Sequence, residues 1–432
     1  MGLLMLQHRG QDSAGMVTSN IRDTYEIHKS KGLVNDVFAD EKIIDKLVGN
    51  FGIAHVRYPT AGSKCGISGA QPFHVDQPSD MFLVHNGNLT NVDNFMSKWN
   101  MVSDSQVLLN IFADQIDPHS PKEYAIASAI KQMMDKLQGS FSCLTLIHDV
   151  GLVAFRDPRG IRPLVLGHRE GDWCVASEDC AFAPMGFVRV RDVNPGELII
   201  IGNDGKFISM QVATPTTKPC IFEYVYLARP DSNINDISVH EFHMGLGHKL
   251  AERLAKKKWN VDIVTCIPDG ARYIAHELAK HAGLPFQEAF VKNRYVGRTF
   301  IMPDQSIREN AVKLKLNPIP NVFEGKNVLL VDDSIVRGTT MIQVVKMARM
   351  AGARKVYIAS ASPPVRYPNV YGIDIPNKTE LVANGLSQDE ICTVLGADGV
   401  LYQTVEDMVA IGKKLNPRII EFETSCFDGN YI

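Results

Sequence analysis

The sequence has little net charge, no long apolar run and no closely spaced cysteines. Its 45 Lys and Arg residues nearly balance 48 Asp and Glu, which gives a formal net charge of −3. This balance disfavours nucleic acid or an anionic membrane as the main partner. No apolar stretch approaches the roughly 18 residues of a membrane span. The first residues also do not show a basic region, an apolar region and a small-residue cleavage site in the order of a secretory signal peptide. We therefore expect a soluble protein that is not secreted.

The cysteines are too scattered for a disulfide framework or a zinc site, because no two of them form a CxxC pair. In a chain of this length, this spacing is typical of reduced thiols, and we expect a cytoplasmic location. The eight cysteines are Cys65, Cys143, Cys174, Cys180, Cys220, Cys266, Cys392 and Cys426.

The length of 432 residues predicts two or three domains, at about 150 residues each. In the first half, short apolar runs that indicate strands are separated by helical patterns, which favours a layered α+β domain. The strand-like runs are residues 51–56, 81–85, 142–147 and 151–155, and the helical patterns are 93–99, 105–113 and 122–136. Residues 211–219 contain two prolines and are the predicted linker.

After the linker, strands alternate with helices of about ten residues, which predicts βαβ units and a parallel sheet. The expected helices are residues 239–257, 273–282 and 340–350, and the expected strands are 261–267, 327–331 and 355–360. The predicted domains are therefore residues 1–212 and residues 213–432.

The strongest local signal is an acid pair at the end of an apolar strand, Asp332 and Asp333, followed by a short loop that opens into a helix. Ligands bind at the carboxyl ends of strands in open α/β sheets, and a helix N-terminus suits a phosphate. Gly338 allows close backbone approach, and Thr339 and Thr340 add hydroxyl donors. The carboxylates are suited to ribose hydroxyls, directly or through Mg²⁺. Two alternatives are an acid pair that only caps the helix and one that accepts a phosphoryl group.

Upstream of the acid pair, residues 290–300 carry Lys292, Arg294 and Arg298 in a glycine-containing stretch that continues to Pro320. A long irregular segment beside a ligand site is often a lid, and its cations would meet a pyrophosphate. The alternative is a solvated surface loop.

Three polar segments of the first half also stand out. They are residues 7–15, residues 55–60, and residues 85–89 with the nearby Ser103 and Asp104. Each has a structural explanation, since Asn-Gly is a turn signal and Ser or Asp before an apolar helix is an N-cap.

The acid-pair loop resembles the 5-phosphoribosyl-1-pyrophosphate (PRPP) signature of type I phosphoribosyltransferases. The three polar segments together resemble the glutaminase domain of class II, N-terminal-nucleophile amidotransferases. Over essentially the whole chain, both halves are similar to the glutamine PRPP amidotransferase (amidophosphoribosyltransferase) family, which starts purine synthesis. The resemblance implies a layered αββα N-terminal-nucleophile hydrolase-like domain followed by an α/β phosphoribosyltransferase domain.

The resemblance also implies roles for individual residues. Arg57 would bind the glutamine α-carboxylate and Asp104 its α-ammonium group, while Asn86 and Gly87 would form the oxyanion hole. Asp332 and Asp333 would hold Mg²⁺. The implied PRPP-binding residues are Lys292, Arg298, Asp332, Asp333, Ser334, Ile335, Val336, Arg337, Gly338, Thr339 and Thr340.

The implied reaction displaces pyrophosphate from PRPP with ammonia, derived from glutamine, to give 5-phosphoribosylamine. The family is usually homo-oligomeric and inhibited by purine nucleotides. The alternative reading is a regulatory protein that uses the same loop only to sense PRPP or a nucleotide.

The sequence departs from the family at three places. The nucleophilic N-terminal cysteine of the family is absent from the chain as given, so we expect it to lack glutamine-dependent activity and to keep ammonia-dependent synthesis. Gly270 stands where the family commonly has a hydroxyl residue. Cys220 and Cys426 align with two of the four ligands of an iron–sulfur cluster that some members carry, but Asn369 and Glu423 occupy the other positions, so we expect no cluster.

Overall fold

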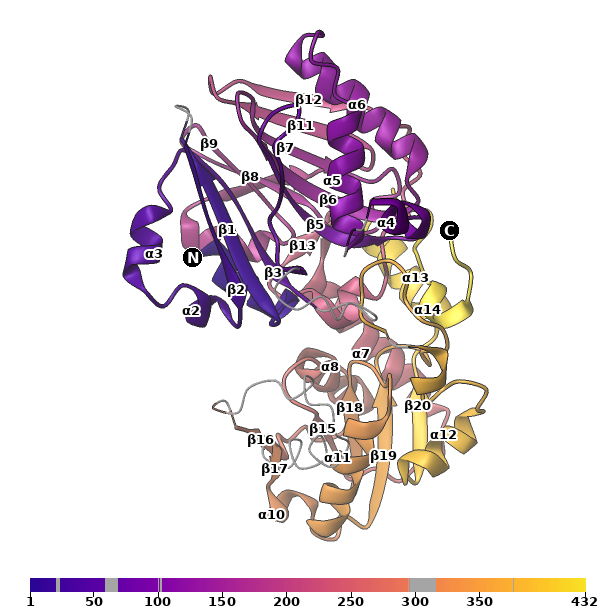
Figure 1. Cartoon of the computed structure of the whole chain (residues 1–432). Coiled ribbons are helices and arrows are strands. Elements are labelled where there is room, and N and C mark those ends of the chain that lie inside the picture. The colour runs from indigo at the N-terminus through magenta and orange to yellow at the C-terminus, as the bar shows by residue number, and fades with distance from the viewer. Residues whose placement is uncertain are drawn as a thin grey trace.

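The computed structural model describes residues 1–20, 24–58, 69–99, 101, 103–293, 295, 316–375 and 377–432, without the side chains of residues 94 and 98. The chain forms two halves that lie one above the other in Figure 1. Among these described residues, no helix has both the length and the apolar character needed to cross a membrane.

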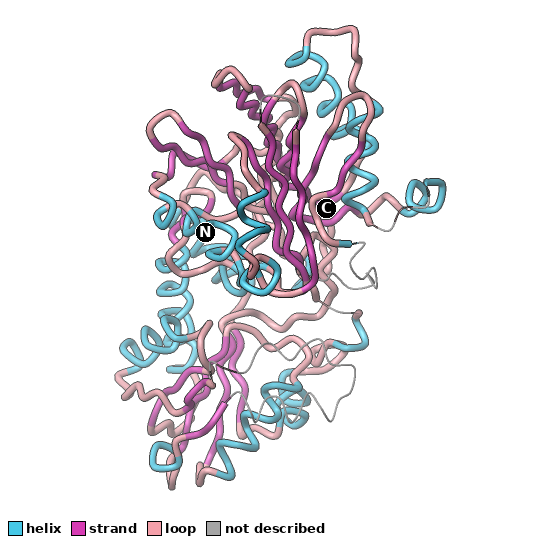
Figure 2. Tube along the Cα trace, turned by 60° about the vertical axis from the view of Figure 1, so that its left-hand side comes forward, coloured by secondary structure: helices cyan, strands magenta, loops and turns pink. Residues whose placement is uncertain are grey.

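The described residues of the first half form three sheets, and their strands are magenta in the upper part of Figure 2. A six-stranded sheet has the order β12-β11-β7-β6-β5-β4, and two three-stranded sheets have the orders β2-β1-β3 and β10-β8-β9. The strands are β1 Ser13–Ser19, β2 Tyr25–Lys31, β3 Phe51–Arg57, β4 Phe73–Val75, β5 Met81–Leu89, β6 Gly139–Ile147, β7 Gly151–Arg156, β8 Val165–Arg169, β9 Asp172–Ala176, β10 Val188–Asp192, β11 Glu197–Gly202 and β12 Phe207–Gln211. The helices are α1 Gly2–Met5, α2 Val34–Val37, α3 Glu41–Lys46, α4 Asp93–Trp99, α5 Asp104–Asp114 and α6 Lys122–Lys136, with 3₁₀ turns at Gln7–Arg9, Asp179–Ala181 and Ala183–Met185.

Alternation along β5 shows how these sheets form layers. Met81 and Leu83 pack into the cluster shared with α5 and α6, whereas Phe82 and Val84 pack into the cluster shared with Val17 of β1. Successive side chains of a strand point to opposite faces, so both faces of this sheet are buried. Because α1 and α2 cover the β2-β1-β3 sheet in a further cluster, the order of layers is helix, sheet, sheet, helix, as the resemblance implied.

The second half is built on a parallel sheet with the order β15-β18-β19-β20. Its strands are β15 Ile263–Cys266, β18 Asn327–Asp332, β19 Lys355–Ser360 and β20 Gly399–Tyr402, with short pairs β13 Asn233–Ile234 with β14 Ile237–Ser238, and β16 Phe290–Lys292 with β17 Leu316–Pro318. Its helices are α7 Val239–Ala255, α8 Arg272–Ala282, α10 Pro320–Phe323, α11 Thr339–Met350, α12 Gln388–Leu395, α13 Val405–Leu415 and α14 Ser425–Asp428, with a π turn at Glu223–Leu227 and a 3₁₀ turn at Lys378–Glu380.

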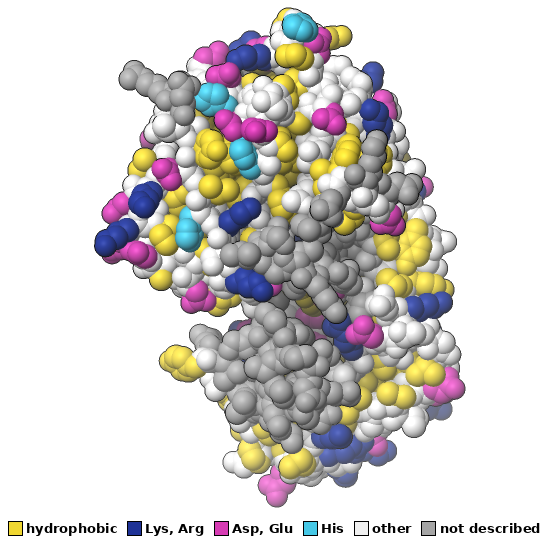
Figure 3. Space-filling model, viewed as in Figure 1, with side chains coloured by type: hydrophobic (Ala, Val, Ile, Leu, Met, Phe, Trp, Pro, Cys, Tyr) yellow, Lys and Arg dark blue, Asp and Glu magenta, His cyan; other side chains and the backbone are white. Residues whose placement is uncertain are grey.

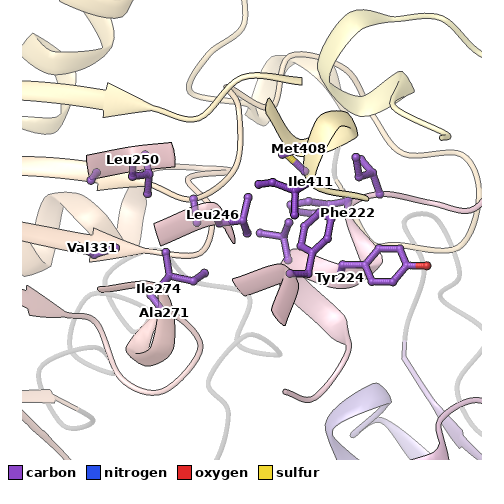
Figure 4. Packing of buried hydrophobic residues seen from close by; sticks show 14 of the residues in the cluster. Phe222, Tyr224, Leu246, Leu250, Ala271, Ile274, Val331, Met408 and Ile411 are labelled. Carbon is purple, nitrogen blue, oxygen red and sulfur yellow. The ribbon is translucent and has the colours of Figure 1, made fainter. Parts of the chain in front are cut away.

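Both faces of this sheet are covered by helices. Leu246 and Leu250 of α7, with Ile274 of α8, pack toward Val331 on one face, where Figure 4 shows them continuous with Met408 of α13. Helices α11 and α12 cover the other face. Strands that are buried on both faces read as continuous apolar runs rather than alternating ones, which is why residues 327–331 were recognisable as a strand.

The expected elements are confirmed with small changes at their ends. Helices α4 and α6 and strand β19 have the predicted bounds, and α7 ends two residues earlier than expected, at Ala255. The predicted linker begins at the last residue of β12, and residues 212–219 contain no helix or strand.

The two halves are joined by buried polar contacts. Arg9 of the first half contacts Glu178 of its own half and Glu223 of the second half, at 2.7 Å from Glu223, and Arg162 lies 2.5 Å from Glu223. At a second place, Arg156 donates to the Asn235 side-chain oxygen at 3.1 Å. These contacts place the halves in one fixed arrangement.

Charged side chains of both signs are interspersed on the face shown in Figure 3. This agrees with the small net charge of the sequence. An anionic ligand would therefore be bound by charges and dipoles of a local site rather than by an overall positive surface.

Candidate active site

A cavity lies where strands β3 and β5 and helix α5 of the first half meet the second half. Its volume is about 510 Å³. The four residues expected to handle glutamine, namely Arg57, Asn86, Gly87 and Asp104, all line it. The fold therefore brings together residues that are separated by up to 47 positions in the sequence.

Arg57 is the last residue of β3 and is largely buried. Its Nη1 donates to the Asp12 carboxylate at 2.8 Å. Asp12 directly precedes β1, which pairs with β3 so that Ser13 lies opposite Arg57. This ion pair fixes the guanidinium at the wall of the cavity, where it suits a carboxylate ligand.

Asp104 begins helix α5, and Ser103 is its N-cap, with its hydroxyl accepting from Gln106 N at 3.3 Å. The Asp104 carboxylate accepts from Leu89 N at 3.1 Å and from Ser105 N at 2.8 Å. These backbone donors hold the negative charge toward the cavity. Ser103 is thus the helix N-cap that its position before an apolar helix predicts, while the Asp104 carboxylate lies at the cavity wall.

Asn86 and Gly87 lie on β5, opposite Ser142 and Phe141 of β6. The Asn86 side-chain amide lies 3.5 Å from the Ser177 hydroxyl. Gly87 has a φ of 153°, and a side chain there would overlap the backbone oxygen of Ser140. Glycine is therefore required at this position, which is not a turn but an extended strand.

His55 is a cavity residue that the sequence analysis did not assign. It lies on β3 two residues before Arg57, and its Nδ1 is buried without a hydrogen-bond partner. Burial, assisted by the nearby His85 and Arg57, lowers the pKa of His55 to about 3. Its imidazole is therefore neutral at physiological pH.

Residues of the second half complete the wall of this cavity. They are Tyr226 and Leu227 of the π turn and the segment Gly372–Asp374. The sequence analysis gave neither segment a role, because nothing local in them indicates contact with the first half.

The acid pair lies at the carboxyl end of β18, a central strand of the parallel sheet. Burial and the neighbouring charge of Asp333 raise the pKa of Asp332 well above its ordinary value. Asp333 accepts from the Ser334 hydroxyl at 2.7 Å. Two adjacent carboxylates repel each other, and such a pair is suited to a cation or to hydroxyl donors.

The loop from Ser334 to Gly338 leads directly into α11. Gly338 is the N-cap with a φ of 77°, and no side chain caps the helix. The Ile335 side chain is buried in the core, so only its backbone is available to a ligand. Arg337 donates to Glu380 at 3.0 Å. The loop from Ser334 to Thr340, which we call the cradle, therefore offers a ligand backbone groups and the hydroxyls of Ser334, Thr339 and Thr340.

Of the expected cationic loop, the structure describes only Lys292 among the predicted PRPP-binding residues, and Arg298 lies outside the described residues. Lys292 is paired with Asp269 at 2.5 Å. A side chain on Gly270 would overlap the Asp333 carboxylate. Asp333 thus fills the space that a hydroxyl residue at position 270 would need, and the loop of residues 268–272 borders the acid pair.

The four positions that align with iron–sulfur ligands are buried beside the interface of the halves. Burial raises the pKa of the Cys220 and Cys426 thiols. The Asn369 side-chain oxygen accepts from Tyr371 N at 2.8 Å and Ile373 N at 3.1 Å, and Glu423 accepts from Ser425 N at 2.7 Å. Asn369 and Glu423 therefore fix backbone turns. Within the described ranges, no group of three or more His, Cys, Asp or Glu side chains has the geometry of a metal site.

The cavity beside the first half's sheets and the acid-pair loop of the second half's parallel sheet, each on its own fold, define a two-part class of enzyme. The class is a glutamine amidotransferase domain joined to a phosphoribosyltransferase domain. Family models agree: residues 64–184 match the glutamine amidotransferase domain and residues 235–365 the phosphoribosyl transferase domain.

Relatives of known name cover the whole chain. Amidophosphoribosyltransferase of Escherichia coli is 48% identical over 100% of this chain and 88% of its own length, and that of Schizosaccharomyces pombe is 43% identical over 100% and 86%. The solved glutamine PRPP amidotransferase of B. subtilis, complexed with ADP and GMP, is 36% identical with a TM-score of 0.87, covering 100% of this chain and 93% of that one. The chain belongs to the amidophosphoribosyltransferase family.

Membership makes this chain an enzyme of the phosphoribosyl-transferring class. The alternative of a sensor that only binds PRPP or a nucleotide is not favoured, because the relatives that match the full chain carry the name of the enzyme. A sensor would also have no need of the glutaminase-type cavity.

Proposed function

We propose that this chain forms 5-phosphoribosylamine from PRPP and ammonia as a step of purine biosynthesis. The observation that carries the proposal is the joint presence of the acid-pair cradle and the cavity with Arg57 and Asp104, on two halves locked together by Arg9 and Glu223. The solved structure with a TM-score of 0.88 is titled the allosteric regulatory enzyme of purine biosynthesis, which supports the assignment.

In the proposed phosphoribosyltransferase site, the ribose 5-phosphate group binds the loop from Ser334 to Thr340. The unpaired N–H groups at the start of α11 and the hydroxyls of Thr339 and Thr340 are its donors. Asp332 and Asp333 face the ribose hydroxyls. Lys292 would leave Asp269 to meet the pyrophosphate, and we propose the same target for Arg298.

The acid pair fits Mg²⁺ because its oxygen donors are hard, and because Mg²⁺ is commonly held by one or two carboxylates together with substrate phosphates. The mutual repulsion of the Asp332 and Asp333 carboxyls also favours a cation. When bound, Mg²⁺ would neutralise charge on the departing pyrophosphate. Asp332 and Asp333 would orient the ribose.

In the proposed glutamine site, Arg57 binds the α-carboxylate and Asp104 the α-ammonium group. The Asn86 amide and the Gly87 N–H stabilise the oxyanion. None of the cysteines that the structure describes lines this cavity. Glutamine hydrolysis requires a nucleophilic thiol at this cavity, whereas synthesis from free ammonia does not.

Three further features are part of the proposal. The domains are residues 1–212 and 213–432, supported by the irregular segment after β12. Purine nucleotides inhibit the enzyme, supported by the ADP and GMP of the B. subtilis complex. The protein is a cytoplasmic homo-oligomer; light scattering of the purified protein tests the assembly.

The deciding assay measures pyrophosphate release from PRPP with ammonium and Mg²⁺. We expect release by the unsubstituted chain and none by Asp332→Asn, with GMP or ADP lowering the rate. Tight binding of PRPP without release would contradict the proposal and would favour a sensor. Circular dichroism of Asp332→Asn controls for unfolding.

A further inference from the structure

A turn of the second half reaches the strand that carries the proposed oxyanion hole. This interface turn comprises residues 369–375. The Asn369 side-chain oxygen holds it in shape by accepting the N–H groups of Tyr371 and Ile373. The turn thereby presents the carbonyls of Val370 and Tyr371 and the backbone of Gly372 to the first half.

Ser140 of β6 links the interface turn to β5. Its hydroxyl donates to the Tyr371 carbonyl at 2.8 Å and accepts from the Asn88 N–H at 3.2 Å. The Asn88 side-chain amide donates to the Val370 carbonyl at 3.0 Å. Ser140 is 0% exposed, so water does not compete for its hydrogen bonds. Direct hydrogen bonds therefore connect the interface turn to β5 through the Ser140 hydroxyl.

Two glycines, Gly87 and Gly372, allow the backbones of β5 and the interface turn to lie close together. A Cβ placed on Gly372 would lie 2.9 Å from Cα of Gly87, and one placed on Gly87 would overlap the Ser140 backbone oxygen. Gly87 is thus held between Ser140 on one side and Gly372 on the other. The φ of 99° at Gly372 is a conformation that favours glycine.

We propose that the Ser140 hydroxyl is a positioning group for the oxyanion hole, which is completed only across the interface of the two halves. The Tyr371 carbonyl anchors Ser140, Ser140 anchors the Asn88 N–H, and the Gly87 N–H is thereby aimed into the cavity. This inference rests on the proposed glutamine site and adds to it the residue that sets its geometry from the second half.

The test compares Ser140→Ala with Ser142→Ala. Ser142 is a matched control, because it is two residues along the same strand, is buried, and donates to the Arg162 carbonyl at 3.0 Å within the first half. Calorimetry measures binding of L-glutamine and of L-norvaline, which shares the α-carboxylate and α-ammonium groups but has no side-chain carbonyl.

We expect Ser140→Ala to raise the Kd of L-glutamine by about three- to tenfold, as for the loss of one hydrogen bond, and to leave the Kd of L-norvaline unchanged. Ser142→Ala should change neither Kd. Hydrogen exchange by mass spectrometry should show faster exchange in β5 peptides containing Asn88 for Ser140→Ala only.

Equal weakening of both ligands by Ser140→Ala, or equal effects of the two variants, would overturn the inference, because either points to general disturbance of the strand. An unchanged Kd for both ligands would also overturn it. If the unsubstituted chain binds neither ligand, the proposed glutamine site itself fails, and this inference falls with it. Gly372→Ala, which presses on Gly87 from the other side, should weaken L-glutamine selectively as well.

Discussion

Replacing Arg9 by Met should destabilise the protein more than any change to a surface ion pair. The Arg9 side chain is 8% exposed and contacts Glu178 and Glu223, which are 0% and 2% exposed. Removing one partner of a buried ion pair costs about 3–5 kcal/mol, because a buried charge is left uncompensated.

The lower end of that range applies here, because each carboxylate keeps other donors. Glu178 still accepts from His8 at 2.7 Å and from the Ser232 hydroxyl at 2.7 Å, and Glu223 keeps Arg162 at 2.5 Å. We therefore expect a loss of about 3 kcal/mol in the free energy of unfolding. This corresponds to a fall of roughly 6–12 °C in Tm for domains of this size.

Urea unfolding at pH 7 measures the loss, with Trp99 and Trp173 reporting the first half and Trp259 the second. The control is Lys249→Met, which breaks an exposed pair with Glu252 at 2.8 Å and should cost under about 1 kcal/mol. A loss for Arg9→Met no greater than for this control would refute the reasoning. A double-mutant cycle with Glu178→Gln should show non-additive losses, because the two residues share one network.

The pH dependence of the free energy of unfolding provides a second check on the Arg9→Met variant. Burial alone would raise the pKa of Glu178, but the Arg9 charge and His8 outweigh it and hold the pKa well below its ordinary value. A lowered carboxyl pKa stabilises the fold above the unfolded pKa of about 4.3, and this stabilisation is lost as the pH falls through the folded pKa. The stability difference between the unsubstituted chain and Arg9→Met should therefore be full at pH 7 and should shrink below about pH 4.

Three further changes address the two sites. Asp333→Asn should abolish ammonia-dependent pyrophosphate release while the Tm stays level or rises, because it relieves repulsion with the buried Asp332; a large fall in Tm would contradict this. Arg57→Lys should weaken L-glutamine binding by about 10- to 100-fold in calorimetry, since Lys cannot bind a carboxylate bidentately; an unchanged Kd would remove Arg57 from the site. Gly338→Ala should lower PRPP affinity and reduce the free energy of unfolding by about 1–2 kcal/mol, because the φ of Gly338 is 77° and a Cβ would lie 3.1 Å from Val382 and Leu395. PRPP titration measures the first effect and urea unfolding the second.

The phosphoribosyltransferase site could be predicted from the sequence because its chemistry is contiguous. The strand, the acid pair, the glycine and the helix start lie within residues 327–340, and local rules of strand burial and helix N-termini apply to such a stretch directly. The unbroken apolar run from Met81 to Val84 likewise indicated a strand before its two covering layers were known.

Contacts between distant residues gave no such signal. Arg9 lies in a polar run, and its partners Glu178 and Glu223 are 169 and 214 residues away. His55 was quoted in a motif, but its burial depends on neighbours from β5. Lys292 pairs with Asp269, which lies 23 residues earlier, and no local pattern in the sequence indicated this partner.

The polar character of the interface explains how one half can shape the other. An apolar interface of equal area would hold the halves together at least as firmly, since a buried ion pair is often no more stabilising than packed hydrophobic groups. Apolar contacts tolerate small sliding movements, whereas hydrogen bonds weaken steeply with distance and angle. The Arg9 network and the Ser140 link therefore fix the register of the halves, and a shift of about 1 Å at Tyr371 would already break the Ser140 hydrogen bond. Such precision is what an oxyanion hole assembled across two domains requires.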